Sequence, residues 1–457
     1  NYRGHEILMV QSNSNAVVPF LVSTNKYGIL WDNYSKTIFK DAPDSAYFWS
    51  EMGEAVDYYV VTGEVMDDVI AGYRELTGKA PLFGKWAYGF WQCKERYKTS
   101  EELLHVVKEY RKRNIPIDNI VQDWQYWPEG QFSGMTWDRK RYPDLNQMID
   151  SLHNLNVRLM VSIWPAVGKD SEIYKELKNK DLLFNKVHWG GARVYDAFSK
   201  EARDIYWKYL KAGLFDHGVD AFWMDGTEPE FMSTGDRYVT EASIKENKSC
   251  AFGAIAKYLN LFSYYTTQGV YDNHRSATSN QRVFILTRSA FAGQQAYAAA
   301  TWSGDIHASW QVFKNQIVAG INMGMAGIPY WTSDIGAFLT EHNYPNALNS
   351  NAYKELYLRW YQFGTFNSIF RAHGTDIPRE IWQFGEEGDW AYDGISRMNN
   401  LRYRLLPYIY STAWRTTDQG YSFIRGLPLA YPGDKKVHEI DDQYMFGSAF
   451  LVNPVTE

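Results

Sequence analysis

Trp86-Ala-Tyr-Gly-Phe-Trp91 and Asn119-Ile-Val-Gln-Asp-Trp124 are two apolar runs that predict buried β-strands. Between them, Thr99 precedes Glu102 by three residues, which is the spacing of a capping box at a helix N-terminus. Apolar residues then recur at helical spacing, at Leu103, Val106, Val107 and Tyr110. A strand, a helix and a second strand in this order predict a βαβ unit with parallel strands.

The same alternation continues along most of the chain. Asp144 is a candidate N-cap for a helix whose apolar face comprises Leu145, Met148, Ile149 and Leu152. Further strands are expected at Arg158–Trp164, Ala221–Asp225, Val283–Thr287, Thr301–Asp305, Ile328–Ser333 and Ser368–Ala372. Further helices are expected at Lys200–Asp216, Ser309–Ile321, Tyr353–Tyr361 and Met398–Thr412. Eight strands, most of them followed by a helix, favour the α/β class and a closed (β/α)8 TIM barrel over an open sheet.

Both ends of the chain differ in pattern from this barrel. Short β-branched and aromatic runs predict β-structure before residue 84, at Val17–Ser23, Gly28–Trp31 and Ala55–Thr62. After Gly420 the pattern returns to β-structure, with Gln443–Asn453 as a pair of strands. We therefore expect three parts, with boundaries near residues 83 and 420.

Composition and charge exclude several classes of partner. With 47 Lys and Arg against 53 Asp and Glu, the net charge is -6, and no basic stripe is available for nucleic acid. No run reaches the roughly 18 apolar residues of a membrane span, so no membrane partner is expected. Cys93 and Cys250 form neither a disulfide framework nor a paired zinc motif. Asn1–Val10 shows no targeting pattern, and we expect the chain to start inside a domain. The compartment stays unknown, with a secreted or periplasmic location favoured.

Aromatic residues are unusually frequent. The chain contains 18 Trp, 34 Tyr and 24 Phe, which together make up 17% of it. A core rich in large rings accounts for most of them. A sugar-binding cleft is the other reading, because the apolar face of a pyranose packs flat on an indole or phenol ring. Composition alone leaves both readings open.

The carboxyl ends of the predicted strands carry mostly polar residues, and in a barrel these ends form the active site. They are Asp123, Trp164, Asp225, Arg288, Asp305, Asp334 and His373. A single Asp at a strand end more often caps a helix or a turn, but four carboxylates with an Arg and a His are harder to explain in that way. Glycoside hydrolysis needs such a set, because one carboxylate attacks or activates water while a second protonates the leaving oxygen.

Two other chemistries fit these residues less well. A Mg²⁺ or Ca²⁺ site favours closely spaced carboxylates, whereas these lie on different strands, so neither a metal nor another cofactor is expected. A nucleotide site is disfavoured because no Gly-x-Gly-x-x-Gly or Walker loop follows the first strand. Gly84, Gly89 and the pair Gly190-Gly191 fit turns or close packing better.

Several segments resemble glycoside hydrolase family 31, the retaining α-glucosidases and α-xylosidases. Ala221-Phe-Trp-Met-Asp225-Gly-Thr-Glu228 is similar to the nucleophile segment of that family, and Trp302-Ser-Gly-Asp305 is similar to its acid/base segment. The other similar segments follow in the family's order: Arg288 in Thr-Arg-Ser-Ala, Asp334 in Ser-Asp-Ile-Gly-Ala-Phe, and Arg371-Ala-His373-Gly. The resemblance implies that residues 1–83 end an N-terminal β-sandwich domain, that residues 84–420 form the catalytic barrel, and that residues 421–457 begin a C-terminal β-domain.

Gly226-Thr227 departs from the Met-Asn pair that usually follows the nucleophile in the α-glucosidase branch. With Asp123-Trp-Gln-Tyr-Trp127, this departure makes the chain most similar to the α-xylosidases that act on xyloglucan oligosaccharides. Xylose lacks the C6 hydroxymethyl group of glucose, so a bulky ring near C5 would reject glucose sterically. Trp91, Tyr126 and Trp127 are candidates for that ring, and packing at the barrel rim explains them equally well.

The resemblance implies an exo-acting enzyme that works by double displacement. Asp225 would be the nucleophile and Asp305 the acid/base, with carboxyl groups about 5 to 5.5 Å apart. Their proton affinities should differ, since Asp305 must hold a proton while Asp225 stays charged beside donors such as Arg288. The residues that the resemblance implies for sugar binding are Asp123, Trp223, Arg288, Trp302, Asp334, Phe338 and His373.

Other functions remain open on the sequence. An α-glucosidase or an α-glycosyl transglycosylase would share the same motifs. A non-catalytic sugar-binding barrel is a further alternative, although the presence of both Asp225 and Asp305 argues against it. A metal-dependent isomerase barrel would lose activity in chelator. An oligosaccharide is the expected partner, while the oligomeric state and the subsites on loops 128–139 and 233–246 are undetermined.

Overall fold

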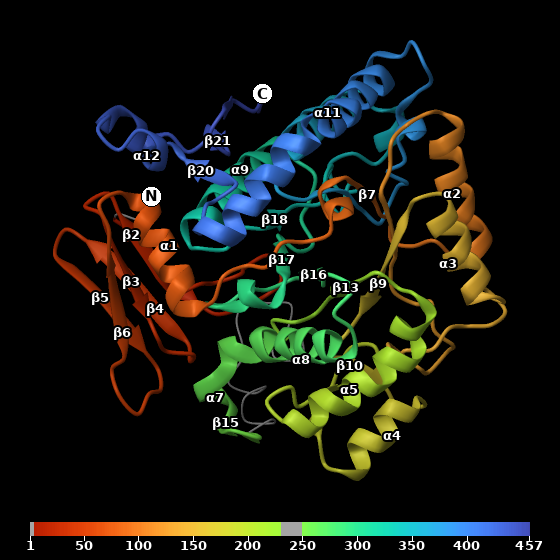
Figure 1. The fold of residues 1–457 in the computed structure, drawn as a ribbon, viewed down its shortest axis with the longest axis horizontal. Coiled ribbons are helices and arrows are strands. Elements are labelled where there is room, and N and C mark those ends of the chain that lie inside the picture. Colours follow the sequence, from red (N-terminus) through yellow and green to blue (C-terminus); the bar gives the residue numbers. More distant parts are fainter. Residues whose placement is uncertain (1–3, 230–248) are drawn as a thin grey trace.

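A computed structural model describes residues 4–229 and 249–457, and its centre is a barrel of parallel strands (Figure 1). Eight strands pair in the order β18-β17-β16-β13-β9-β8-β7-β19, so every strand lies beside its neighbour in the chain. They are β7 (Phe90–Gln92), β8 (Asn119–Gln122), β9 (Arg158–Ile163), β13 (Ala221–Met224), β16 (Ile285–Thr287), β17 (Ala299–Trp302), β18 (Trp331–Thr332) and β19 (Phe370–Ala372). A parallel bridge between Ile335 and Ala372 joins the β18 and β19 ends of the sheet. The predicted α/β class and TIM barrel are confirmed.

Helices surround the strands and follow the predicted alternation. They are α2 (Ser100–Lys112), α3 (Leu145–Asn154), α5 (Lys200–Gly213), α8 (Phe262–Ala277), α9 (Trp310–Met325), α10 (Asn351–Thr365) and α11 (Trp390–Gln419). The connection from β16 to β17 holds only the 3-10 turn η5 (Gln294–Tyr297). Thr99 and Asp144 cap α2 and α3 as predicted, because their side chains accept the backbone N–H of Glu102 and Gln147.

Several predicted boundaries are wrong. The aromatic run at residues 86–91 begins as a 3-10 turn, η1 (Lys85–Tyr88), and only its end enters β7. β17 starts and ends earlier than predicted, so Asp305 lies three residues beyond it in a loop. Apolar periodicity does not distinguish a short buried strand from another buried segment. Helix α8 was not predicted from the sequence, because its Tyr, Thr and Gly residues are weak helix formers.

An excursion between β9 and α5 was not anticipated. It contains β10 (Ala166–Gly168), α4 (Glu172–Asn179), β11 (Leu183–Val187) and β12 (Ala192–Tyr195). The three strands form an antiparallel sheet in the order β10-β12-β11. This small sheet directly follows Trp164 at the carboxyl end of β9. The predicted loop at residues 233–246 lies outside the described residues.

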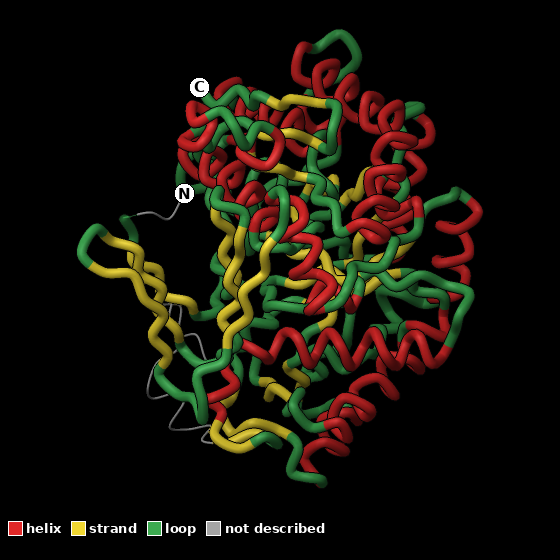
Figure 2. Tube along the Cα trace, turned by 60° about the vertical axis from the view of Figure 1, so that its left-hand side comes forward, coloured by secondary structure: helices red, strands yellow, loops and turns green. Residues whose placement is uncertain are grey.

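The two ends of the chain form antiparallel sheets beside the barrel, and their strands are yellow in Figure 2. The N-terminal sheets have the orders β1-β4-β5 and β2-β3-β6. Their strands are β1 (Glu6–Met9), β2 (Phe20–Ser23), β3 (Tyr27–Trp31), β4 (Thr37–Ala42), β5 (Ser45–Ser50) and β6 (Tyr58–Thr62), and α1 (Met66–Thr77) follows. The C-terminal sheet contains β20 (Ile424–Gly426), β21 (Tyr444–Phe446) and β22 (Phe450–Val452), with α12 (Leu427–Ala430) after β20. A short hairpin, β14 (Ser249–Cys250) and β15 (Gly253–Ala254), leads through α7 (Ile255–Tyr258) to α8. The exact domain boundaries stay predictions.

A fully buried arginine fastens these flanking parts to the barrel. Arg74 of α1 donates to the carbonyl oxygens of Gly327, which follows α9, and of Tyr421, which precedes β20, both at 2.9 Å. Arg425 of β20 forms two hydrogen bonds, of 2.6 and 2.7 Å, to the carboxylate of Asp67 in α1. Separating the fully buried Arg74 from these carbonyl oxygens would leave a buried charge without partners, so the contact holds α1 against the barrel.

Candidate active site

The predicted site residues lie in or just after barrel strands. Trp223 and Trp302 belong to β13 and β17, whereas the others follow the strands: Asp123 after β8, Asp225 after β13, Arg288 after β16, Asp305 after β17, Asp334 and Phe338 after β18, and His373 after β19. Parallel strands bring their carboxyl ends to one face of a barrel. Side-chain contacts divide these residues into two groups, each built around an arginine.

Arg288 is the centre of the first group, which we call the catalytic cluster: Asp225, Glu228, Arg288 and Asp305. Its Nη1 lies 3.1 Å from Asp225 Oδ1 and 3.3 Å from Asp305 Oδ2. Its Nε and Nη2 donate to Glu228 Oε1 at 3.0 and 2.6 Å. One buried guanidinium therefore contacts three carboxylates, two from the segment after β13 and one from the loop after β17. A single cation in this position reduces the repulsion among the acidic groups.

The two predicted catalytic carboxylates have different surroundings. The Asp225 side chain is 11% exposed and accepts the Gly226 N–H at 2.7 Å, whereas the Asp305 side chain is 32% exposed. Gly226 adopts a left-handed φ of 63°, which glycine tolerates without strain. The Asp225 carboxylate is thus the more buried of the two, and the more exposed Asp305 is open to a leaving group or to water.

Glu228 was not among the predicted site residues, although it is completely buried against Arg288. Its signal was visible in the sequence, since it stands three positions after Asp225 in a segment already singled out. Glu228 was quoted from the sequence only as the last residue of the segment that resembles the nucleophile motif. The structure places it behind Arg288, where it orients the guanidinium.

The second group, which we call the binding cluster, comprises Asp123, Asp334, Arg371 and His373. Arg371 forms an ion pair with Asp334, and both side chains are fully buried. His373 Nε2 lies 3.9 Å from Asp123 Oδ2. Arg371 was quoted in the sequence motif and not selected as a site residue, because an arginine inside a strand is indistinguishable by pattern from a structural one.

Burial dominates the protonation of the binding cluster. It raises the pKa of Asp123 to about 8, against the hydrogen bond of 2.6 Å that the Trp124 N–H donates to Asp123. It also raises the pKa of Asp334 to about 7, with Arg371 opposing the shift. Burial together with Arg371 and Arg379 holds the pKa of His373 well below its usual value. Desolvation favours the neutral form of each group.

The rings of Trp223, Trp302 and Phe338 lie against residues of the binding cluster. Trp223 makes edge-to-face contacts with Trp302 and His373, at centroid distances of 5.3 and 4.9 Å. Phe338 stacks on His373 at 5.3 Å. The Arg371 guanidinium lies 5.1 Å from the Trp223 ring centre. These contacts fix the rings in one orientation.

Several polar atoms in this region are buried and have no hydrogen-bond partner among the described residues. They are the Nε1 atoms of Trp164, Trp223 and Trp302, Asp334 Oδ2 and His373 Nδ1. Leaving a buried polar group unpaired costs about 1–3 kcal/mol, so such groups are rare and usually serve a purpose. Donors and acceptors of this kind, set between aromatic faces, suit a ligand with many hydroxyl groups.

The three candidates for a ring near C5 lie in different surroundings. Trp91 is buried against Phe284 and donates its indole N–H to the Ala87 carbonyl at 2.8 Å. Tyr126 is buried between Trp127 and Trp137. These contacts are typical of packing, which was the alternative reading for both. Trp127 also packs on Phe132, at 5.1 Å.

A wall of rings leads outward from the catalytic cluster. The Arg288 guanidinium lies 5.7 Å from the Trp164 ring centre, and Trp164 is 5.9 Å from Trp189 in the unanticipated excursion. Trp189 also meets Trp124 edge to face at 5.4 Å, yet it is 58% exposed. Sequence reasoning missed Trp189 because no periodic pattern surrounds it. An exposed indole beside buried ones suits the flat face of a further sugar.

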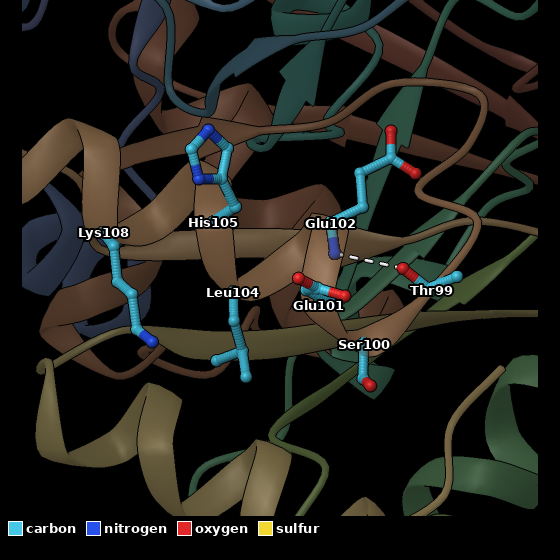
Figure 3. Close-up of a pocket in the computed structure, with 7 residues that line it drawn as sticks. All are labelled: Thr99, Ser100, Glu101, Glu102, Leu104, His105 and Lys108. Carbon is cyan, nitrogen blue, oxygen red and sulfur yellow. Dashed lines mark hydrogen bonds between the residues drawn. The ribbon is translucent and has the colours of Figure 1, made fainter.

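A surface hollow of about 600 Å³ lies on α2 and is lined by Thr99, Ser100, Glu101, Glu102, Leu104, His105 and Lys108 (Figure 3). None of the predicted site residues lines it.

No described helix is both long and apolar enough to cross a membrane. Within residues 4–229 and 249–457, no group of three or more His, Cys, Asp or Glu side chains is arranged to hold a metal ion.

Comparisons with known proteins agree with this geometry. Residues 80–412 match the glycosyl hydrolases family 31 TIM-barrel domain, and residues 420–457 match the family's C-terminal domain. The chain is 42% identical over 456 residues to an alpha-xylosidase of Saccharolobus solfataricus, covering 100% of this chain and 60% of that protein. It is 29% identical to alpha-glucosidase 2 of Bacillus thermoamyloliquefaciens, covering 99% of this chain and 56% of that protein. The chain thus spans only part of the length of these relatives.

Solved structures show the same similarity. A GH31 alpha-xylosidase from Xanthomonas citri superposes with a TM-score of 0.93 at 31% identity, covering 100% of this chain and 67% of that one. A GH31 alpha-xylosidase from a soil metagenome, complexed with xylose, gives a TM-score of 0.92 at 33% identity, covering 100% of this chain and 69% of that one. Together with the family matches across the barrel, these similarities establish that the chain belongs to glycoside hydrolase family 31.

Proposed function

We propose that this protein is a retaining, exo-acting α-xylosidase that releases α-linked xylose from xyloglucan oligosaccharides. The observation that carries the proposal is the contact of Asp225 and Asp305 with the same atom, Arg288 Nη1. It brings together two carboxylates that follow different strands, β13 and β17. The binding cluster beside them offers buried donors and acceptors for sugar hydroxyls.

In the proposed mechanism, Asp225 attacks the anomeric carbon and forms a glycosyl ester. Asp305 donates its proton to the departing sugar oxygen and then removes a proton from the water that releases xylose. The Gly226 N–H and Arg288 stabilise the carboxylate of Asp225. The greater exposure of Asp305 gives the leaving group and the incoming water access to its carboxyl group.

The geometry supports retention of configuration. The contacts of 3.1 and 3.3 Å to one nitrogen limit the separation of the two oxygens to the sum of these distances. Retaining enzymes hold their two carboxyl groups about 5 to 5.5 Å apart, whereas inverting enzymes leave roughly 6.5 Å or more for a water molecule. Contact of both carboxylates with one nitrogen favours the closer arrangement, in which Asp225 attacks directly.

The preference for xylose over glucose rests on similarity and on the sequence. Identity to the Saccharolobus solfataricus alpha-xylosidase is 42%, whereas an alpha-glucosidase of the same organism shares 27%. Gly226-Thr227 also departs from the α-glucosidase pattern. An α-glucosidase remains the second candidate, because relatives with that name match 88% or more of the chain.

The test compares aryl α-xyloside with aryl α-glucoside and follows the released sugar by NMR. We expect faster hydrolysis of the xyloside and α-xylose as the first product, before mutarotation. Faster hydrolysis of the glucoside would favour the second candidate, and β-xylose as the first product would contradict retention. Xyloglucan oligosaccharides with xylose at the non-reducing end should release xylose alone. Binding without release would instead indicate an inactive sugar-binding barrel.

A further inference from the structure

A tight turn from the N-terminal part of the chain reaches the proposed acid/base. Ser12 and Asn15 exchange backbone hydrogen bonds of 3.0 and 2.9 Å, which leaves Asn13 and Ser14 at the tip of the turn. The Asp305 N–H donates to Asn13 Oδ1 at 3.0 Å, and Asn13 Nδ2 donates to Asp305 Oδ2 at 2.7 Å. The first bond fixes the orientation of the amide, because a backbone N–H needs an acceptor. The amide NH2 group must then face the carboxylate.

This turn is anchored in the barrel. The buried Gln11 side chain donates to the carbonyl oxygens of Ala290 at 2.6 Å and of Val17 at 3.0 Å. Its backbone N–H donates to Asn260 Oδ1, also at 3.0 Å. Ala290 lies two residues after Arg288. The segment that carries the arginine of the catalytic cluster therefore also fixes the turn.

Gly304 permits the close approach of the turn. A Cβ atom at this position would lie 2.3 Å from Asn13 Oδ1 and 2.6 Å from the Ser14 nitrogen. The glycine also has a φ of 74°, in the left-handed region that other residues rarely adopt. The residue before Asp305 thus has both the size and the conformation that the contact requires.

We propose that Asn13 is a positioning residue for Asp305, which directs the transferable proton to Oδ1 by occupying Oδ2. This proposal rests on the proposed function, since it assumes that Asp305 is the acid/base. Asp305 Oδ2 accepts from both Asn13 Nδ2 and Arg288 Nη1, at 2.7 and 3.3 Å. An oxygen that accepts two donors is a poor place for a proton, so the protonated acid carries it on Oδ1. After proton transfer, both donors stabilise the carboxylate that serves as the base.

The first test removes the donor with Asn13→Ala and measures kcat/KM on two substrates. Phenyl α-xyloside needs a proton on its leaving oxygen, whereas α-xylosyl fluoride expels fluoride with little acid assistance. Loss of a hydrogen bond to a charged group should lower kcat/KM on the phenyl substrate roughly 10- to 100-fold. On the fluoride the change should stay below about threefold. Asn25→Ala, in the exposed turn between β2 and β3, is the matched control and should change neither value.

The second test uses Asn13→Asp, which keeps the size of the side chain and places a carboxylate against Oδ2. Arg288 faces Asp305 directly, and the carboxyl groups of Asp225, Asp123 and Asp334 lie in the same site. A further negative charge favours the protonated acid, so the basic limb of the kcat/KM profile should move to higher pH. The shift should be larger for Asn13→Asp than for Asn13→Ala.

Equal losses on both substrates, with an unchanged pH profile, would show that Asn13 is only structural and would overturn the proposal. No loss on either substrate would overturn it as well. Asp305→Ala separates this failure from failure of the proposed function. It should lower the rate on phenyl α-xyloside far more than on the fluoride, and with the fluoride azide should speed the breakdown of the glycosyl ester and give a product of retained configuration. If Asp305→Ala shows no dependence on the leaving group, the assignment of Asp305 itself is wrong.

Discussion

The catalytic cluster and the binding cluster each surround one buried arginine, but they treat charge differently. Arg288 contacts three carboxylates, one of which is 32% exposed, so charge is shared and one group stays open to reactants. Arg371 forms an ion pair with Asp334, and burial moves Asp123 and His373 toward their neutral forms. The same barrel face thus holds one region suited to reactions that change charge and another suited to uncharged hydroxyl groups. Burial favours the neutral forms of Asp123 and Asp334 in the binding cluster.

The largest effect should come from removing Asp225, the proposed nucleophile. Asp225→Ala should lower kcat on aryl α-xyloside by roughly 10⁴-fold or more, because no other group occupies the position of attack. Azide should restore turnover and yield a β-xylosyl azide, whose inverted configuration is read by NMR. Asp44→Ala, in the exposed turn between β4 and β5, is the control. A near-normal rate for Asp225→Ala would remove the basis for the whole cluster.

Glu228 should matter less, because it acts through Arg288. Glu228→Gln keeps the shape and one acceptor but removes a buried charge, and we expect kcat/KM to fall roughly 10- to 100-fold. The loss should be similar on phenyl α-xyloside and α-xylosyl fluoride, since Glu228 does not contact Asp305 in any described interaction. Glu101→Gln, exposed on α2, is the matched control. A strong dependence on the leaving group would contradict the positioning role.

The raised pKa of Asp123 in the binding cluster should make the free energy of unfolding depend on pH. The pKa of Asp123 is raised from 3.8 to about 8, so between these values the folded protein holds a proton that the unfolded chain has lost. Stability from this group is therefore present at low pH and is lost as pH rises toward 8, by at most about 1.4 kcal/mol per pH unit. Asp123→Asn removes this loss.

Denaturant unfolding at pH 5 and pH 8 measures the effect. The free energy of unfolding should decline less between these values in Asp123→Asn than in the unmodified protein. Asp44→Asn should leave the decline unchanged. Parallel declines in Asp123→Asn and the unmodified protein would mean that Asp123 is charged when folded, and the contrast between the two clusters would lose its main support.

The smallest effect is expected at the outer end of the ring wall. Trp189→Ala should raise KM for a xyloglucan oligosaccharide roughly three- to tenfold and leave KM for a small aryl α-xyloside unchanged, because only the longer substrate reaches the exposed indole. Trp49→Ala replaces a tryptophan of β5 that is 45% exposed and serves as the control. Equal changes in KM on both substrates would mean that Trp189 supports the fold and does not bind the longer substrate.

Local patterns in the sequence were sufficient for much of the fold. The capping residues Thr99 and Asp144 begin helices as predicted, because a cap depends on only a few neighbouring residues. Strand ends were less accurate. The carboxyl end of β17 was placed at Asp305, whereas the strand ends at Trp302, since pairing with β16 and β18 sets its length.

The sequence by itself determined the barrel, the order of its units and the polar residues that follow its strands, because periodicity and capping act over a few residues. Only the tertiary structure decided which of these residues meet. Arg288 joins Asp225 and Asp305, and Asn13 reaches Asp305 across 292 positions of the chain. Such contacts depend on barrel closure, on the docking of the N-terminal part and on a glycine at position 304. No short-range pattern encodes them, because their distances are set by packing between segments that are remote in the chain.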